Sequence, residues 1–200
     1  MSKNEYDRIK IITLGNTDVG KSCFILRFTE NFFKENFLST QGIDLKSKYI
    51  TIDEKLYRVD FYDTAGQEKY KSIAYNVIKN ADGILLIYDV TQIKTFESIS
   101  EWIDNIEIHK QPDVQIILIG NKCDLKESRN ITYEEGKELA EKYKCDFFET
   151  SNKEGTNVEE AGNALVKKII EVREKRKKEK SDNHVIKNLK TKQSNKKSCC

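Results

Sequence analysis

Eight residues near the N-terminus carry the first chemistry in the sequence. Residues 15–22 read Gly-Asn-Thr-Asp-Val-Gly-Lys-Ser and match the pattern G-x-x-x-x-G-K-[ST] in full. In such a loop, backbone N–H groups wrap phosphates, the lysine (Lys21) reaches the β- and γ-phosphates, and the hydroxyl (Ser22) binds Mg²⁺. The segment therefore predicts a nucleoside triphosphate site with Mg²⁺, rather than an ordinary glycine-containing turn.

A second motif, Asn121-Lys122-Cys123-Asp124, follows an apolar run that ends at Gly120. A carboxylate such as Asp124 accepts hydrogen bonds from both N1–H and the exocyclic amine of guanine. Adenine has an acceptor at N1 and no amine at C2, so it would leave the desolvated carboxylate unpaired. Alone, the motif is also compatible with a polar loop that caps a helix. Together with the phosphate loop it predicts a guanine nucleotide at the carboxyl edge of a sheet.

Apolar runs that alternate with helix-like stretches must position these motifs. The alternation predicts a parallel, doubly wound sheet. Two further segments, 43–52 and 55–63, are joined only by Asp53-Glu54 and so predict an antiparallel hairpin at the edge. We expect an α/β P-loop NTPase fold, with a mostly parallel six-stranded sheet, one antiparallel edge strand and about five flanking helices. The runs read as strands are 9–14, 84–90, 114–119 and 147–148, and those read as helices are 21–29, 95–110, 133–143 and 158–176.

Charge is distributed unevenly along the chain. Residues 172–200 carry 11 Lys/Arg and 3 Asp/Glu, a balance of +8, whereas the other residues carry 24 and 30, a balance of −6. From about residue 177 the apolar periodicity fades, so we expect a folded domain at 1–176 and a disordered basic tail at 177–200. No apolar run approaches the ~20 residues needed to span a bilayer. The N-terminus resembles neither a signal peptide nor a myristoylation site, which indicates synthesis in the cytosol.

In combination, the motifs resemble those of the Ras-like small GTPases and, within them, the Rab family. The resemblance covers roughly residues 7–175 and the two terminal cysteines. It rests further on residues 63–68 (Asp-Thr-Ala-Gly-Gln-Glu), similar to the start of switch II, and on 150–153 (Thr-Ser-Asn-Lys), similar to the second guanine-binding loop. Residues 39–44 (Ser-Thr-Gln-Gly-Ile-Asp) resemble the end of switch I. The resemblance implies a small GTPase domain at 1–176 that acts as a GTP/GDP switch in vesicular membrane trafficking.

The resemblance also implies a role for each matching residue. Gln67 would hold the attacking water in line with the γ-phosphate, and Thr40 would sense that phosphate. Phe33 would lie against the guanine, Ser151 would brace Asp124, and the Asn152 amide would meet the guanine oxygen. The implied Mg²⁺ ligands are Ser22, Thr40 and Asp63, of which Asp63 would hold the ion through water. The implied nucleotide contacts are Thr17, Asp18, Val19, Gly20, Lys21, Ser22, Cys23, Phe33, Ser39, Thr40, Gly66, Asn121, Lys122, Asp124, Ser151, Asn152 and Lys153.

The segment from Glu30 to Gly42 contains no arginine, so no charge-stabilising finger comes from switch I. We expect slow intrinsic hydrolysis, on the order of 10⁻⁴ to 10⁻² s⁻¹, until a partner supplies the missing charge. The resemblance implies a monomer with an exchange factor, a GTPase-activating protein, a GDP-dissociation inhibitor, a prenylation escort and GTP-dependent effectors that bind switches I and II.

The chain ends in Ser198-Cys199-Cys200, which resembles the double geranylgeranylation site of Rab proteins. One lipid chain gives marginal membrane binding, whereas two anchor a protein stably, and basic residues add attraction to anionic leaflets. We therefore expect lipids at Cys199 and Cys200. The expected location is the cytoplasmic face of an intracellular membrane, with cycling through the cytosol.

Departures from the Rab pattern affect the expected effector surface, where this chain has Gln41, Leu45, Tyr62 and the segment 77–81 (Val-Ile-Lys-Asn-Ala). Asp18 is the departure nearest the chemistry. Its carboxylate either repels the bound nucleotide and speeds GDP release, or points to solvent, where screening removes the effect.

Three other functions remain as alternatives. One is a Ras- or Rho-type signalling GTPase. Another is a scaffold that holds a nucleotide without hydrolysing it, which Gln67 argues against. The third is a nucleic-acid-binding protein that uses the basic tail. That tail has no recognisable reading motif and no aromatic residue beyond Val172 on which bases would stack, so we expect no nucleic acid partner.

Overall fold

The computed structural model describes residues 6–34, 43–64 and 77–194, with side chains placed for 6–34, 44–64 and 77–179. The described strands form one sheet in the order β2-β3-β1-β4-β5-β6. The strands are β1 (Asp7–Leu14), β2 (Ile43–Ile52), β3 (Lys55–Thr64), β4 (Gly83–Asp89), β5 (Gln115–Asn121) and β6 (Asp146–Thr150). The helices are α1 (Lys21–Glu30), α3 (Ile93–Glu97), α4 (Ile99–His109), α5 (Tyr133–Tyr143), α6 (Val158–Ser194) and a 3₁₀ turn, η2 (Lys126–Ser128).

The sheet confirms the predicted fold class. All pairings are parallel except that of β2 with β3, so the one antiparallel strand lies at the edge. The hairpin turns at Asp53 and Glu54, whose φ angles of 49° and 62° are those of a tight two-residue turn. Five α-helices lie among the described residues, as expected.

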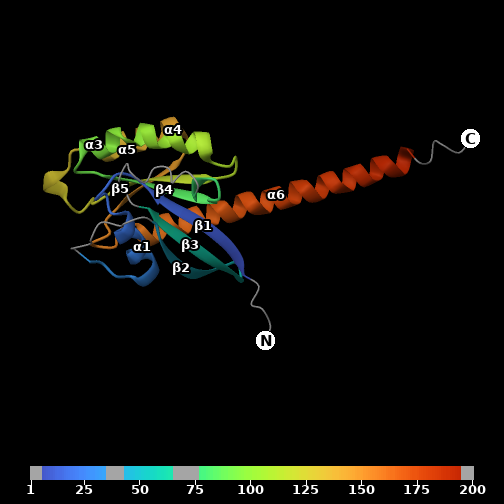
Figure 1. Ribbon diagram of the computed structural model, residues 1–200, viewed down its shortest axis with the longest axis horizontal. Helices are drawn as coiled ribbons and strands as arrows, with labels where there is room; N and C mark the ends of the chain where they lie inside the picture. Colours follow the sequence, from blue (N-terminus) through green and yellow to red (C-terminus); the bar gives the residue numbers. More distant parts are fainter. Residues whose placement is uncertain (1–5, 35–42, 65–76, 195–200) are drawn as a thin grey trace, which may run out of the picture.

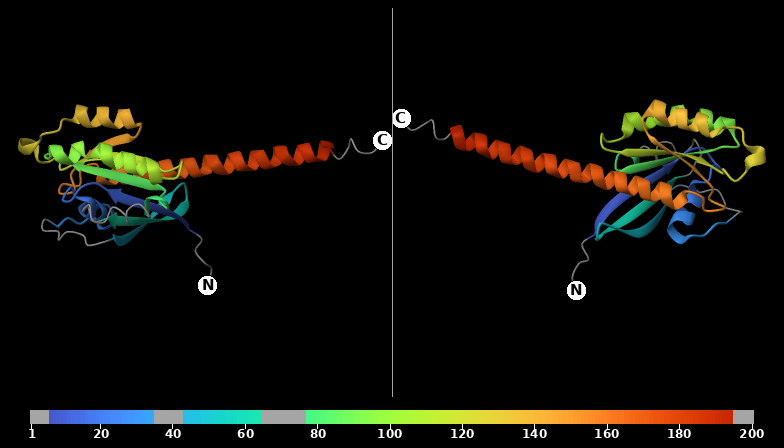
Figure 2. Two further views of the ribbon diagram at one scale, coloured as in Figure 1. Left: turned by 45° about the horizontal axis from the view of Figure 1, so that its top comes forward. Right: turned by 180° about the vertical axis from the view of Figure 1, so that it is seen from behind.

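Helices cover both faces of the sheet (Figures 1 and 2). Two hydrophobic cores, one on each face, fill the space between the sheet and the helices. Strand β1 contributes to both because successive side chains of a strand point to opposite faces. Ile9 and Ile11 pack with residues of α1 and α6, whereas Ile12 and Leu14 pack with residues of α4 and α5. The sheet therefore contributes side chains to both cores and lies between the two layers of helices.

The single helix predicted at 95–110 is two helices that meet at Ser98. The Ser98 hydroxyl donates to the Lys94 carbonyl over 2.7 Å, and this carbonyl also accepts from the Ser98 N–H at 3.1 Å. A side-chain bond of this kind bends a helix. The same hydroxyl accepts from Nδ2 of Asn16 over 3.2 Å, so the junction of α3 and α4 is tied to the loop after β1.

Helix α6 continues to Ser194 and runs away from the body (Figures 1 and 2), which differs from the expected loss of structure at 177. No glycine or proline follows Gly162 in this helix, and Lys, Arg and Glu are good helix formers. Burial nevertheless ends near the predicted domain boundary, because Ile170 is the last buried residue among the side chains described to Glu179.

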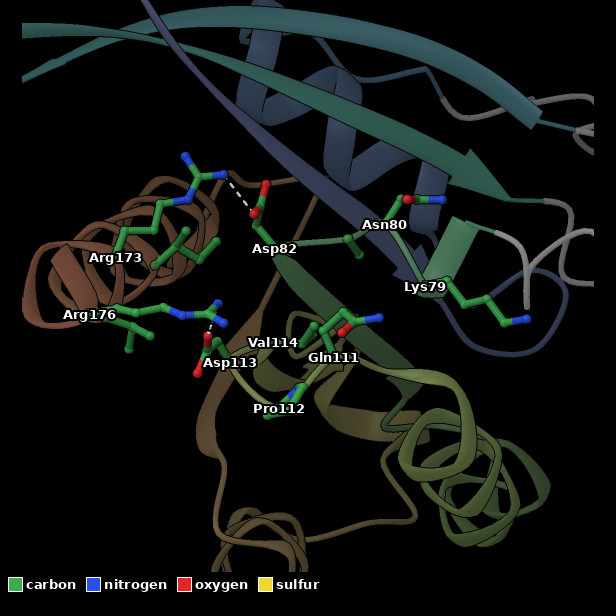
Figure 3. Close-up of a pocket in the computed structure, with 12 residues that line it drawn as sticks. Lys79, Asn80, Asp82, Gln111, Pro112, Asp113, Val114, Arg173 and Arg176 are labelled. Atoms are coloured by element: carbon green, nitrogen blue, oxygen red, sulfur yellow. Dashed lines mark hydrogen bonds and ion pairs between the residues drawn. The ribbon is translucent and has the colours of Figure 1, made fainter. Parts of the chain in front are cut away.

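Two arginines in the middle of α6 pair with aspartates just before the amino ends of β4 and β5. Arg173 pairs with Asp82 at 2.6 Å, and Arg176 pairs with Asp113 (Figure 3). They border a cavity of about 260 Å³ on the edge of the sheet opposite the phosphate loop. Within the described residues, no helix is both long enough and apolar enough to cross a membrane.

Candidate nucleotide-binding site

The predicted binding motifs meet at one edge of the sheet. The parallel strands β1, β3, β5 and β6 end there at Leu14, Thr64, Asn121 and Thr150. The phosphate loop and the two guanine motifs begin at or just after the ends of β1, β5 and β6, and segment 63–68 begins one residue before the end of β3. Ligands of open α/β sheets bind beyond the carboxyl ends of the strands. The fold therefore brings together segments that are more than 100 residues apart in the chain.

The phosphate loop between β1 and α1 depends on two glycines. Gly15 and Gly20 have φ angles of 135° and 100°, which favour glycine. A Cβ at Gly15 would lie 2.1 Å from the Ile87 carbonyl oxygen, and one at Gly20 would lie 2.3 Å from Nδ2 of Asn121. Neither position has room for a side chain, so at both positions only the backbone can line the loop.

Lys21 turns its ammonium back into this loop. Nζ donates to the carbonyls of Gly15 at 3.0 Å and Asn16 at 2.7 Å, and the side chain is buried. Burial lowers the pKa of Lys21 from 10.5 to about 8, and the carboxylates of Asp63 and Asp18 oppose part of that shift. A buried cation at the N-terminus of a helix suits a phosphate.

Two of the expected Mg²⁺ ligands touch one another. The Ser22 hydroxyl donates to Asp63 Oδ2 at 2.5 Å, and Thr13 Oγ1 donates to Asp63 Oδ1 at 3.4 Å. Hydroxyl and carboxylate oxygens are the hard donors that Mg²⁺ prefers. The pair therefore fits a site for this ion beside the first turn of α1.

The first guanine motif is held from both sides. Asn121 is almost fully buried; its Nδ2 donates to the Val19 carbonyl at 2.8 Å, and its Oδ1 accepts from Thr150 Oγ1 at 3.1 Å. Lys122 pairs with the buried Asp89 at 2.7 Å, which fixes the end of its side chain. Asp124, the proposed guanine ligand, is half-buried in the loop that follows.

The second guanine motif is tied to α1. The Ser151 hydroxyl is buried and accepts from the Glu154 N–H at 3.0 Å. Nδ2 of Asn152 donates to the Gly20 carbonyl at 2.9 Å, and Arg27 donates to the carbonyls of Asn152 at 2.8 Å and Lys153 at 2.6 Å. The Ser151 hydroxyl thus holds its own loop, and its predicted contact with Asp124 stays a prediction.

The remaining predicted contacts differ in how far they are buried. Thr17 and Asp18 are exposed, Val19 is buried, and Cys23 is half-buried, with burial raising the pKa of its thiol. Phe33 is half-buried, with the Arg27 guanidinium 6.0 Å from its ring centre. Ser39, Thr40, Gly66, Gln67, Cys199 and Cys200 lie outside the described residues.

Sequence reasoning missed three positioning residues. Asp89 orients Lys122, Arg27 braces the second guanine motif, and Asn16 accepts from Trp102 Nε1 at 2.9 Å. Of the three, only Asp89 could have been found from the sequence, because it is a carboxylate near the end of the apolar run 84–90. Strand β4 ends at this residue, on the same edge of the sheet as the motifs.

Comparison with known proteins agrees with this geometry. The model of the Ras family matches residues 10–171. A Ras-related protein Rab-8B of Pongo abelii is 43% identical over 166 residues, which cover 82% of this chain and 80% of the relative. The chain belongs to the Rab branch of the Ras family.

Two further relatives are similarly close. The GTP-binding protein ypt2 of Schizosaccharomyces pombe is 42% identical over 170 residues, covering 84% of this chain and 85% of its own. A Rab-10 of Diplobatis ommata is 39% identical over 172 residues, covering 86% of each chain. This Rab-family chain is accordingly a small GTPase, a GTP hydrolase of vesicle trafficking that binds guanine nucleotides and works with regulators or effectors at intracellular membranes. The resemblance to Rab proteins read from the motifs is thereby confirmed.

Proposed function

We propose that this Rab-family chain holds GTP or GDP together with Mg²⁺ at the carboxyl edge of its sheet and uses the residues named above. The observation that carries the proposal is the convergence of the buried Lys21 ammonium, the Ser22–Asp63 pair and the two guanine motifs at one edge. The described part of that edge has the glycine-lined loop, the cation and the hard oxygen ligands that a guanine nucleotide with Mg²⁺ requires.

The phosphate side of the site is formed by residues 17–23. The N–H groups of the loop and of the first turn of α1 face the phosphates, and Lys21 neutralises their charge. Ser22 and Asp63, joined by Thr40 from switch I, would hold Mg²⁺. When bound, this ion neutralises charge that develops on the β- and γ-phosphate oxygens.

The base side combines two loops. Asp124 accepts from guanine N1–H and the exocyclic amine, while the stems of Lys122 and Lys153 and the ring of Phe33 cover the base. The side-chain amide of Asn152 is engaged with Gly20, so its main-chain N–H is the group that we assign to the guanine oxygen. Ser151 holds this loop in place.

Hydrolysis is assigned to Gln67, whose side chain both accepts from water and donates to phosphate. The test is single-turnover hydrolysis of GTP with Mg²⁺ by the native chain, by Gln67→Leu and by Gln111→Leu, a matched control on the opposite edge. We expect native turnover of about 10⁻⁴ to 10⁻² s⁻¹, slowed on the order of tenfold or more in Gln67→Leu only. Equal rates in all three proteins would remove Gln67 from the mechanism.

Output is assigned to switches I and II, and location to the two cysteines at the C-terminus. Thr40 and Gly66 would tie switches I and II to the γ-phosphate, so effectors read the tied form, and exchange factors and GTPase-activating proteins reset it. A GDP-dissociation inhibitor and a prenylation escort would handle lipids on Cys199 and Cys200, which anchor the chain to the cytoplasmic face of a membrane. A tagged chain with both cysteines changed to Ser should become fully cytosolic; unchanged membrane association would contradict the lipid anchor.

A further inference from the structure

The side chain of Asn152 joins the second guanine loop to the phosphate loop. It is only 4% exposed, and its Nδ2 donates to the Gly20 carbonyl at 2.9 Å. The neighbouring carbonyl, that of Val19, accepts from Asn121 Nδ2 at 2.8 Å. Two carboxamides from separate strand ends therefore hold two successive carbonyls of the phosphate loop.

These bonds fix the direction of the phosphate-facing N–H groups. No cis peptide bond occurs in the described chain, and in a trans peptide the N–H points opposite to the carbonyl of the same plane. Holding the Val19 and Gly20 carbonyls therefore aims the N–H groups of Gly20 and Lys21 to the other side of the loop. The Gly20 carbonyl also accepts the first helical bond from the Phe24 N–H at 2.8 Å, so Asn152 adds a second bond to it.

The packing leaves little freedom at this contact. A Cβ on Gly20 would lie 2.8 Å from Nδ2 of Asn152 and 2.3 Å from Nδ2 of Asn121. Asn152 Oδ1 is buried and has no hydrogen-bond partner among the described residues. A buried amide oxygen without a hydrogen-bond partner lowers the stability of the fold. This cost favours a functional role for the hydrogen bond from Nδ2 to the Gly20 carbonyl.

The same loop is tied to α1 through its backbone. Arg27 Nε donates to the Asn152 carbonyl at 2.8 Å, and Nη2 donates to that of Lys153 at 2.6 Å. Arg27 belongs to the helix that Gly20 begins. The side chain of Asn152 thus binds the residue at which α1 begins, and its backbone carbonyl binds Arg27 near the end of the same helix.

We propose that Asn152 is a positioning residue that couples the two loops, so that release of the base and opening of the phosphate loop occur as one event and GDP is retained longer. This rests on the nucleotide site proposed above. The side-chain bond to Gly20 transmits movement of residues 151–153 to the peptides that face the phosphates.

The test compares release of a fluorescent GDP from the native chain, Asn152→Ala and Asn130→Ala. The control also deletes an asparagine that donates to a backbone carbonyl, that of Thr91 at 2.7 Å, but Asn130 belongs to neither of the two loops. We expect release from Asn152→Ala to be about five- to tenfold faster, the effect of one hydrogen bond, and release from the control to be unchanged. Asn152→Asp, which keeps the shape but cannot donate, serves as a second variant and should also release faster.

Hydrogen exchange separates coupling from a merely structural role. In the GDP-bound native chain, peptides covering 15–24 and 150–156 should exchange with a common opening rate, and in Asn152→Ala the two rates should differ at least about threefold. Native release rates together with a retained common opening rate would overturn the coupling while leaving nucleotide binding intact. A native chain that fails to bind GDP would instead overturn the proposed site, and the coupling with it.

Discussion

The hydroxyl of Ser22 and the carboxylate of Asp63 are in direct contact, with Oγ donating to Oδ2 at 2.5 Å. Ser22 lies in the first turn of α1 and Asp63 near the end of β3, so the contact is made by the tertiary fold. Thr13 donates to the other carboxylate oxygen from the adjacent β1. The two oxygen donors thus lie side by side next to the phosphate loop.

This contact predicts that Asp63→Asn weakens Mg²⁺ binding in the GDP complex. Loss of the carboxylate charge should raise the Mg²⁺ concentration needed to retain GDP by about 10- to 100-fold, comparable to the loss of a residue that orients a metal. The measurement is GDP release as a function of Mg²⁺ concentration. Asp53→Asn in the hairpin turn is the control, since asparagine also suits its positive φ. An unchanged Mg²⁺ requirement in Asp63→Asn would exclude it as a ligand.

The depressed pKa of Lys21 predicts that nucleotide affinity depends on pH. Without ligand, burial places this pKa near 8, so the ammonium loses its proton above that pH. Anionic phosphates favour the charged form, and binding above pH 8 must therefore take up a proton. GDP affinity should fall by up to about tenfold per pH unit in this range.

Calorimetry in two buffers with different ionisation enthalpies at pH 8.5 measures the proton uptake directly. Lys21→Arg, which stays charged, is the control, because deprotonation of guanine contributes equally to both proteins. Equal proton uptake by the native chain and by Lys21→Arg would show that the proton binds to a group other than Lys21. The same burial has a stability consequence: the unfolded chain binds this proton more tightly, so the unfolding free energy should rise between about pH 8 and 10.5.

Gly20→Ala should disrupt the phosphate loop. The new Cβ would overlap the amides of Asn121 and Asn152 and would require a φ of 100°. We expect GDP affinity to fall by more than about 100-fold and stability to fall by about 1–3 kcal/mol. Gly155→Ala is the matched comparison, since its φ is also positive, at 84°, while its nearest neighbour is 3.9 Å away. If both variants bind GDP alike, the steric account of Gly20 is wrong.

Asp18 should have a modest effect that depends on salt. Its side chain is exposed, yet its negative charge raises the pKa of Lys21, so the charge acts on the ammonium that faces the phosphates. We expect Asp18→Asn, which suits the φ of 61°, to release GDP about two- to threefold more slowly at low ionic strength and at the native rate in 1 M salt. Asp18→Gly should behave likewise. Equal release at every salt concentration would leave Asp18 as a solvent-facing residue.

The sequence by itself determined the parts whose geometry is local. The phosphate loop needs two glycines, a lysine and a hydroxyl at fixed spacing, and the hairpin needs a two-residue turn. Alternating apolar runs were enough to predict the alternation of strands and helices along the chain, and the two-residue turn predicted the antiparallel hairpin at the edge of the sheet. These features follow from backbone preference and periodicity over a few residues.

Only the tertiary structure decided which distant groups meet. The pairing of Asp89 with Lys122 depends on the register of β4 with β5, and the bonds of Asn152 and Arg27 depend on how α1 packs beside the loop after β6. The bond that ties the junction at Ser98 to the phosphate loop depends on how α3 and α4 lie beside Asn16. None of these contacts leaves a periodic signal, because each forms only after strand register and helix packing bring residues far apart in the chain into hydrogen-bond range.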